Sequence, residues 1–424
     1  MLAEFRVSNY RSFKDEQVLS MIATSEESKG KNSVKIGKYN ILKSAVVYGA
    51  NASGKSNLIK AMACMNDIVS NSAGYKPDQP LLVVPFAFDE ETPKQPSTFE
   101  VTFFMDGTRY QYGFAATKEI ITGEWLKAWP AETSRPRVLF ERDAQEPEPY
   151  FGPSLKGQNK AIWEKVKDNS LFLSTAAQWN HEQLSNVYKW FTGEFRKMPP
   201  REFGTLFTDQ MFFSANNPIA DSVIPELAMR IFKKADLGID NINIEIADSK
   251  DLHHSQNAIG KYKNTILENL PFLPAYKTTF SHCSGKYSLP FEDESDGTQN
   301  FYSFLWPLVH AVMIGFTLFE DELELNMHPL LTRTMIEFFH DYKNGNKQAQ
   351  LIFTTHDTTL LDPELFGRDQ VWFTEKDNDG ATQLYSLAEY KDVRRDEPMQ
   401  KRYLAGRYGA IPVLERFDLG GTKK

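Results

Sequence analysis

Apolar and polar residues alternate over short runs in the first third of the chain, with the period of half-buried β-strands. The earliest run, residues 4–8, predicts an edge strand, and residues 9–13 follow as a turn. Further on, Asp106-Gly107 separates two alternating runs and is a strong hairpin signal. The segment from 81 to 128 is therefore expected to form an antiparallel sheet. Its apolar or alternating runs are residues 82–84, 98–104 and 110–114.

The middle of the chain changes to the helical period, with apolar residues three or four positions apart. A Pro- and Gly-rich stretch, residues 145–157, marks the change. Residues 159–235 are mostly helical in pattern, and strands are expected again at 241–246 and at 276–291, the latter returning to the core. These changes predict three domains, which are residues 1–150, 151–275 and 276–424.

The last part of the chain contains the longest apolar runs. Residues 301–314 and 329–343 predict helices, and residues 316–319 and 349–354 predict buried strands. The apolar stretch 304–319 is too short to span a bilayer, so burial in a protein core explains it better than a membrane does.

Composition indicates a large globular protein. The 424 residues are 41% hydrophobic and 25% charged, which allows two or three domains with a sizeable core. A net charge of −8 argues against a generally basic surface that coats nucleic acid. Two cysteines in a long chain and an N-terminus without the apolar core of a signal peptide predict a cytoplasmic location.

The strongest chemical signal is a glycine-rich loop between the apolar run 45–48 and a helix predicted at 56–70. It fits the GxxxxGK[ST] pattern, for which an ordinary Gly/Ser-rich turn is the alternative. Glycines let the backbone wrap a polyphosphate, and the helix presents its positive end. Lys55 is expected to reach the β- and γ-phosphates of ATP, and the Ser56 hydroxyl to bind Mg²⁺. The candidate nucleotide contacts are Gly49, Asn51, Ala52, Ser53, Gly54, Lys55, Ser56 and Asn57.

Acidic residues and a histidine follow two later apolar strands. Asp321 is expected to hold Mg²⁺ through water, and Glu322 to orient or deprotonate the attacking water. His356 follows the strand at 349–354, where an imidazole can hydrogen-bond a γ-phosphate. A charged loop on a solvated face, and a histidine with an ordinary polar partner, are the alternatives.

A second anion-binding device precedes the helix predicted at 301–314. Ser295, Gly297 and Thr298 place a serine and a glycine at a helix start, where N–H groups point outward. Since the first loop already holds one nucleotide, this device is expected to serve the nucleotide of another subunit.

Taken in order, these motifs resemble the head of ABC- and SMC-type ATPases. Walker A corresponds to 49–56, a degenerate signature to 295–299, Walker B to Asp321-Glu322 and the switch histidine to His356. More narrowly, the chain is similar to the abortive-infection-type AAA/ABC ATPases of bacterial anti-phage systems, including those of PARIS and RloA-like systems. The residues that carry this similarity are 5–13, 294–298, His328-Pro329, 353–357 and 403–412.

The resemblance implies an α/β fold: an ABC-type ATPase head, or P-loop NTPase with a mixed central sheet and an antiparallel β subdomain, with an inserted mainly helical subdomain. It implies a homodimer or higher homo-oligomer in which Walker A of one subunit and the signature of another enclose each ATP with its Mg²⁺. Arg11 and Ser12 would then approach the nucleotide from the N-terminal turn. Ser295, Gly297 and Thr298 would reach the γ-phosphate held by the neighbour.

The expected function is an ATP-hydrolysing sensor and scaffold of an anti-phage defence complex. It would respond to a phage-derived trigger and control a separately encoded toxic effector, a nuclease, since the sequence holds no second acidic constellation of its own. One alternative is an SMC- or recombination-like DNA-maintenance ATPase that acts directly on nucleic acid. Another is a nucleotide-dependent scaffold with little turnover, because Glu320 occupies the strand position before Walker B. Basic residues between 391 and 416 are interspersed with acids, which favours a solvated or partner-docking face over a DNA groove.

Overall fold

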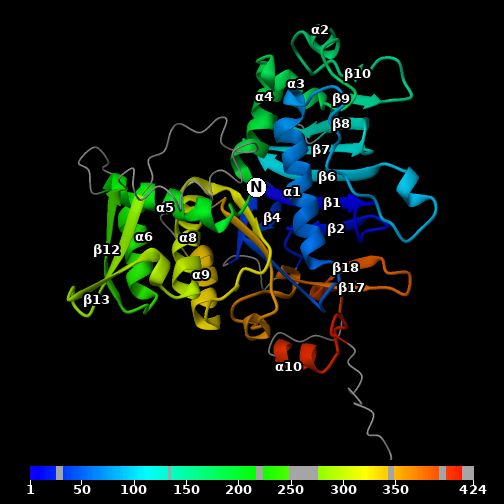
Figure 1. Ribbon diagram of the computed structural model, residues 1–424. Coiled ribbons are helices and arrows are strands. Elements are labelled where there is room, and N and C mark those ends of the chain that lie inside the picture. The colour runs from blue at the N-terminus through cyan, green and yellow to red at the C-terminus, as the bar shows by residue number, and fades with distance from the viewer. Residues whose placement is uncertain are drawn as a thin grey trace, which may run out of the picture. The chain divides into compact units, whose positions relative to one another are not determined.

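The chain folds into two compact units, each built from more than one stretch of sequence. The structure is a computed structural model that describes residues 1–24, 32–131, 135–215, 223–247, 276–341, 348–390 and 398–412 (Figure 1). Unit 1 comprises Met1–Arg196, Phe319–Glu322 and Leu351–Lys424, and unit 2 comprises Lys197–Leu318 and Leu323–Gln350.

A seven-stranded antiparallel sheet lies in unit 1, in the order β10-β9-β8-β7-β6-β1-β2. β6 (Ser97–Met105) and β7 (Thr108–Ala116) form the predicted hairpin. Its turn uses positive φ angles at Asp106 (49°) and Gly107 (75°). The other strands are β1 (Leu2–Ser8), β2 (Gln17–Ser20), β8 (Ile121–Trp129), β9 (Arg137–Asp143) and β10 (Tyr150–Phe151).

Two details of this region differ from the predictions. The edge strand predicted at 4–8 is wrong, because β1 pairs with both β2 and β6. Alternation reports which face is buried, but not whether both edges of a strand are paired. The apolar run 82–84 forms no strand, although Val83 is buried and Val84 is exposed in alternation. The backbone N–H of Arg11 donates to the carbonyl of Val84 (2.7 Å).

The second sheet has six strands in the order β11-β15-β16-β5-β17-β18. β5 (Ser44–Gly49) is buried along its whole length and pairs in parallel with β16 (Gln350–Thr354) and β17 (Val371–Lys376). Parallel strands end at the same edge of a sheet, and ligands of such sheets bind outside that edge. The sheet is mixed because β18 runs antiparallel to β17. The other strands are β11 (Phe195–Lys197), β15 (Thr317–Glu320) and β18 (Thr382–Ser386).

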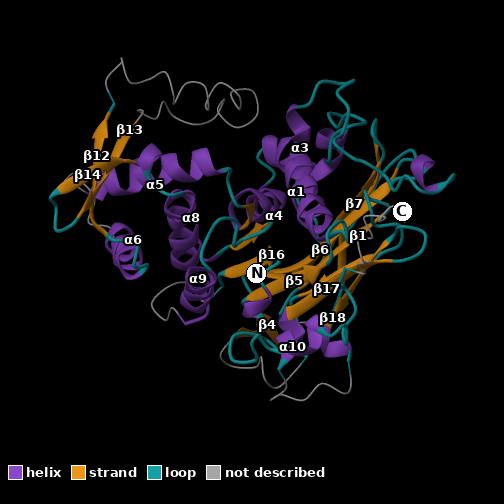
Figure 2. Cartoon of the chain, turned by 60° about the horizontal axis from the view of Figure 1, so that its bottom comes forward, coloured by secondary structure: helices purple, strands orange, loops and turns teal. Residues whose placement is uncertain are grey.

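One hydrophobic core connects the sheets and helices of unit 1. α1 (Lys55–Asn71), the helix predicted at 56–70, buries Leu58 and Met62 in a core that also contains Phe5 of β1 and Val47 of β5. Figures 1 and 2 show α1 beside the strands of both sheets. Apart from short 3-10 helices, the other described elements of unit 1 are the hairpin of β3 (Ser33–Ile36) and β4 (Tyr39–Leu42), α2 (Asn159–Trp163), α3 (Phe172–Gln178), α4 (Glu182–Lys189), the π-helix η3 (Trp190–Glu194) and α10 (Met399–Leu404).

Unit 2 packs helices against a small sheet of its own. The strands predicted at 276–291 do not return to the phosphate-loop sheet: β13 (Tyr276–His282) and β14 (Tyr287–Pro290) pair with each other, and β13 pairs with β12 (Ile239–Ile246). An alternating pattern predicts a strand but does not choose its partner. The described α- and π-helices of this unit are α5 (Arg201–Ala215), α6 (Val223–Lys234), α8 (Asp296–His310) followed by the π-helix η6 (Ala311–Gly315), and α9 (Pro329–Asp341).

The boundaries of the two units differ from those of the three predicted domains, residues 1–150, 151–275 and 276–424. The units are defined by compactness, so the three domains stay a prediction. α2, α3 and α4 lie inside the segment predicted as a helical insertion, yet Ile162, Leu173 and Leu184 are buried in the core of unit 1. The Pro- and Gly-rich stretch at 145–157 is thus a connection within unit 1.

Candidate nucleotide-binding site

The glycine-rich loop joins the buried end of β5 to the start of α1. Gly54 is the N-cap of α1 with a φ angle of 118°, and Ala52 also has a positive φ, 64°. A Cβ atom on Gly49 would lie 2.5 Å from the hydroxyl oxygens of Ser53 and Thr374, so a larger residue does not fit there. The backbone therefore makes the tight turn that a phosphate loop requires, directly before the N–H groups of a helix start.

Buried hydroxyl groups hold the loop against its neighbours. Ser53 Oγ and Thr374 Oγ1, on the adjacent strand β17, are 2.6 Å apart. The hydroxyl of Thr382 lies 2.8 Å from both the Ser53 carbonyl oxygen and Ser12 Oγ. Asn57 Nδ2 donates to the same Ser12 oxygen (2.8 Å). The structure thus brings Ser12, a predicted nucleotide contact, to the first turn of α1.

Positive charge is concentrated inside the loop. Lys55 is buried, and its Nζ donates to the carbonyl oxygens of Gly49 (2.8 Å) and Ala50 (3.1 Å). The ammonium group and the positive end of α1 act on the same place, which favours a polyphosphate anion. A hollow of about 240 Å³ opens on this side and is lined by Ala52, Ser53, Gly54, Lys55, Ser56, Asn57 and Lys376.

Arg11 belongs to the N-terminal turn and has a positive φ of 52°. Its Nε donates to the hydroxyl of Tyr10 (3.2 Å), and its guanidinium lies 5.6 Å from the centroid of the same ring. The N-terminal turn therefore contacts α1 by the hydrogen bond between Ser12 and Asn57, whereas the Arg11 side chain points to Tyr10.

The acidic residues Asp321 and Glu322 come directly after β15, which is two strands away from β5. Strand spacing places these two strand ends about 10 Å apart, a distance that a triphosphate with a metal ion can bridge. Thr354, the last residue of β16, donates its hydroxyl to Asp321 Oδ1 (2.6 Å) and accepts the backbone N–H of Glu322 (2.8 Å). Glu322 has a φ of 53°, uncommon for a residue with a side chain. One buried hydroxyl thus orients both acidic residues.

The two residues predicted to be catalytic face each other. His356 Nε2 lies 3.8 Å from Glu322 Oε1, and both side chains are 43% exposed. His356 follows β16 by two residues, so it stands at the same sheet edge as the loop and the acidic pair.

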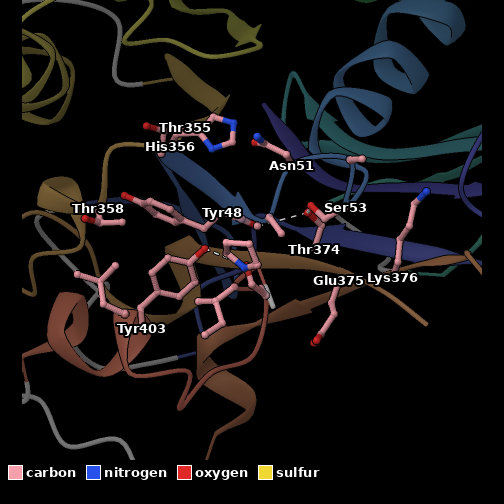
Figure 3. A pocket seen from close by; sticks show the side chains of 17 residues that line it. Tyr48, Asn51, Ser53, Thr355, His356, Thr358, Thr374, Glu375, Lys376 and Tyr403 are labelled. Carbon is pink, nitrogen blue, oxygen red and sulfur yellow. Dashed lines mark hydrogen bonds between the residues drawn. The ribbon is translucent and has the colours of Figure 1, made fainter. Parts of the chain in front are cut away.

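A larger cavity of about 740 Å³ adjoins the exposed tip of the loop (Figure 3). The ends of β5, β16 and β17 contribute residues that include Tyr48, His356 and Thr374, and the C-terminal segment 403–412 supplies the other wall. That segment is held by hydrogen bonds from Tyr403 Oη to the Ala410 carbonyl (3.0 Å) and from Tyr385 Oη to the Tyr408 carbonyl (2.9 Å). Of the predicted basic tail, Lys401, Arg402 and Arg407 are described, and Lys391, Arg394, Arg395 and Arg416 lie outside the described residues.

The predicted signature residues lie in unit 2, at the start of α8. Ser295 is the N-cap and is exposed; its Oγ accepts the backbone N–H of Thr298 (3.2 Å) and lies 2.9 Å from the Thr298 hydroxyl. Thr298 itself is buried, and a Cβ on Gly297 would lie 2.7 Å from the Asn326 carbonyl oxygen. Of the three predicted residues, Ser295 is therefore the one that is exposed; Asp296, which follows it, is exposed as well and lies 3.6 Å from Arg201.

Several residues at the sheet edge were not predicted from the sequence. Thr354, Thr374 and Thr382 hold the loop or the acidic pair, and Lys376 lines both hollows. The available signal was a polar residue at the end of a buried strand, as in Thr354-Thr355 after residues 350–353. That signal is common to many buried strands, so it does not single out these threonines.

The residues at this edge fit a magnesium nucleotide better than a metal centre made by protein alone. In the described part of the chain, no group of three or more His, Cys, Asp or Glu side chains could hold a metal ion. Mg²⁺ in nucleotide sites is bound by one or two protein oxygens together with phosphates and water. Ser56 and Asp321 supply such oxygens, and Thr354 already fixes Asp321 Oδ1. No described helix is long and apolar enough to cross a membrane.

Comparisons with known proteins agree with this geometry. Residues 44–362 match a family described as "AAA domain, putative AbiEii toxin, Type IV TA system". With the mixed sheet and the loop between β5 and α1, this match confirms the predicted α/β P-loop ATPase fold. No curated protein is significantly similar in sequence.

Solved structures of two SMC heads resemble the chain weakly. One is the "SmcHead bound to the C-winged helix domain of ScpA", with a TM-score of 0.38, 11% identity, and coverage of 91% of this chain and 97% of that chain. The other is the "SMC head domain from Thermotoga maritima", with a TM-score of 0.35, 12% identity, and coverage of 91% of this chain and 98% of that chain.

Proposed function

The chain belongs to the AAA-domain family described as putative AbiEii toxin, Type IV TA system, and on this premise we propose that it binds and hydrolyses ATP at the phosphate-loop edge of unit 1. Lys55 and the N–H groups of the loop would hold the β- and γ-phosphates. Ser56 and Asp321 would hold Mg²⁺, which, when bound, neutralises charge on the phosphate oxygens. Arg11 and Ser12 would contact the nucleotide from the N-terminal turn.

The observation that carries the proposal is the position of Glu322. The Thr354 hydroxyl accepts its backbone N–H, and its carboxylate faces His356 at 3.8 Å. Glu322 follows β15, and only β16 separates β15 from the phosphate-loop strand β5. A carboxylate at this position could take a proton from a water molecule that attacks the γ-phosphate. His356 would contact the γ-phosphate from the same edge and report its presence.

Two substitutions test this site. Lys55→Ala removes the ammonium group inside the loop, and we expect ATP affinity to fall by about 100-fold or more, measured by calorimetry. Glu322→Gln preserves size and should keep ATP affinity while reducing phosphate release by about 10²- to 10⁴-fold. If Lys55→Ala binds ATP as tightly as the wild type, the loop is not the phosphate-binding element. If the wild type and Glu322→Gln are equally inactive while ATP still drives assembly, the chain is a scaffold with negligible turnover.

We further propose that ATP holds two or more copies together and that the assembly controls a separately encoded toxic effector in phage defence. The family description, which names a toxin and a toxin–antitoxin system, and the exposed Ser295 at a helix start support this proposal. The neighbouring gene tests it: an adjacent gene for a TOPRIM-like or HNH-like nuclease, co-purifying with this chain, is expected. Salt-dependent DNA binding by the purified chain alone would instead favour a DNA-maintenance ATPase.

A further inference from the structure

Phe88 presents its ring to solvent on the segment that follows α1. The side chain is 70% exposed, whereas Phe86 is buried and packs edge-on against it, with ring centroids 5.7 Å apart. Single exposed apolar residues are ordinary on protein surfaces. What distinguishes Phe88 is therefore not its exposure but the residues that surround its ring.

The ring lies against the hairpin between β17 and β18, beside the phosphate loop. Lys376 Nζ is 5.9 Å from the centroid of Phe88, and a Cβ on Gly380 would approach the ring carbon Cδ2 to 3.0 Å. Lys376 also lines the 240 Å³ hollow together with Ser56 and Asn57. Figure 3 shows Lys376 and Glu375 leaving the end of β17 in opposite directions. A path thus runs from the first turn of α1, past Lys376, to the face of Phe88.

Hydrogen bonds fix this segment to the N-terminal turn. Asn9 Nδ2 donates to the carbonyl oxygens of Thr92 (2.7 Å) and Gln95 (3.0 Å), and Asn9 Oδ1 accepts the backbone N–H of Phe86 (3.0 Å). Lys14 forms an ion pair with Asp89 (2.8 Å), the residue after Phe88. The same turn contacts α1 through Ser12 and Asn57. The ring therefore has a defined place relative to the helix start of the phosphate loop.

We propose that Phe88 and Lys376 form the nucleoside half of the site, with the base stacked on Phe88 and the phosphate chain contacted by Lys376. The inference rests on the proposed function, because it assigns the rest of the same ligand. The proposed γ-phosphate contact, His356, lines the larger cavity, so the other end of the nucleotide is expected on the opposite side of the loop, where Ser56, Asn57 and Lys376 line the smaller hollow. Every nucleobase has a π-face, and stacking on an aromatic side chain strengthens binding by about tenfold or more. The larger face of a purine favours ATP or GTP over pyrimidine nucleotides.

Phe88 is tested by comparing a ligand that has a base with one that lacks it. Affinities for ATP, UTP and inorganic triphosphate, each with Mg²⁺, are measured by calorimetry on the full chain. In Phe88→Ala we expect the ATP affinity to fall about tenfold, toward that of UTP, with the triphosphate affinity unchanged. Phe88→Tyr should restore stacking. The matched control is Leu82→Ala, which truncates a side chain of the same segment that is 69% exposed.

The same measurements test the role of Lys376 separately from the proposed function. Lys376→Met should weaken ATP and triphosphate by the same factor, about three- to tenfold, because an ammonium on the phosphates does not sense the base. An ATP-to-triphosphate affinity ratio that is unchanged in Phe88→Ala, or reduced equally in Leu82→Ala, overturns the role of Phe88. Unchanged affinities in Lys376→Met overturn its role. Loss of the proposed function would show differently, as a wild type that binds neither ligand.

Discussion

The two predicted anion-binding devices of the chain are held in different ways. In unit 1, Ser53 of the phosphate loop is bonded to Thr374 and Thr382, which are 321 and 329 residues away in sequence. In unit 2, Ser295 is bonded to Thr298, three residues away. A loop that distant residues hold has its shape before any ligand arrives, whereas the Ser295 side chain is held by its own helix turn, although Gly297 next to it packs against Asn326. Under the proposed function, the first device would bind a nucleotide by itself, and the second would contact a nucleotide held by another copy.

The largest effect should come from breaking the long-range part of the unit 1 site. Thr354→Val keeps the volume of the side chain but removes the hydroxyl that orients Asp321 and Glu322. We expect phosphate release to fall by about 10²-fold, the cost of a small misplacement of a catalytic group. ATP affinity should change only a few-fold, because Thr354 does not line either hollow.

Thr354→Ser is the matched control for this prediction. It retains the hydroxyl and removes a methyl group, so its hydrolysis rate should stay close to that of the wild type. Steady-state phosphate release and calorimetry are measured on both variants. If serine slows hydrolysis as much as valine does, packing of the methyl group matters and the hydrogen bonds do not.

A smaller effect should follow from changing the charge of the local device in unit 2. Ser295→Asp preserves the N-cap of α8, since aspartate caps helices as well as serine does, but adds a negative charge. If Ser295 approaches a phosphate in the assembly, ATP-driven association should weaken by about tenfold or more, while each copy still binds ATP. Light scattering during gel filtration, in a Glu322→Gln background, reports the association.

Ser295→Asn separates charge from capping, because asparagine is also a good N-cap but is neutral. This variant should associate nearly as well as its parent. Association of Ser295→Asp at the parental level would mean that Ser295 is a helix cap and nothing more.

The effect on function should be smallest for a change that acts on the stability of unit 2 and its dependence on pH. Burial raises the pKa of Asp209 to about 7, although its Oδ1 accepts hydrogen bonds from Thr278 (2.6 Å) and Tyr302 (2.8 Å). The folded state then keeps a proton that the unfolded state loses near pH 4, so the free energy of unfolding should fall as pH rises from about 4 to 7. The slope is at most about 1.4 kcal/mol per pH unit.

Asp209→Asn removes the titrating group while retaining an acceptor for Thr278 and Tyr302. Denaturant unfolding between pH 5 and 8 should be less steep in pH for this variant than for the wild type. An equal slope in the two proteins would assign the pH dependence to other groups.

Elements with a strong local pattern were predicted well. The buried strand at 45–48, the helix at 56–70 and the hairpin at Asp106-Gly107 all occur, because burial, helical period and turn conformation depend on neighbouring residues. Strand partners were predicted less well. β1 is interior, and β13 pairs within unit 2, because pairing depends on backbone edges that side-chain patterns do not describe.

The candidate site divides in the same way. The sequence by itself determined the phosphate loop, Asp321, Glu322 and His356 as candidates, because glycine conformation, a helix start and polar residues after apolar strands are local properties. Only the tertiary structure decided that Thr354 orients both acidic residues, that Thr374 and Thr382 hold Ser53, and that Lys376 lies beside the loop. Those relations join strands far apart in sequence, and the order of strands in the sheet, which no local pattern specifies, creates them.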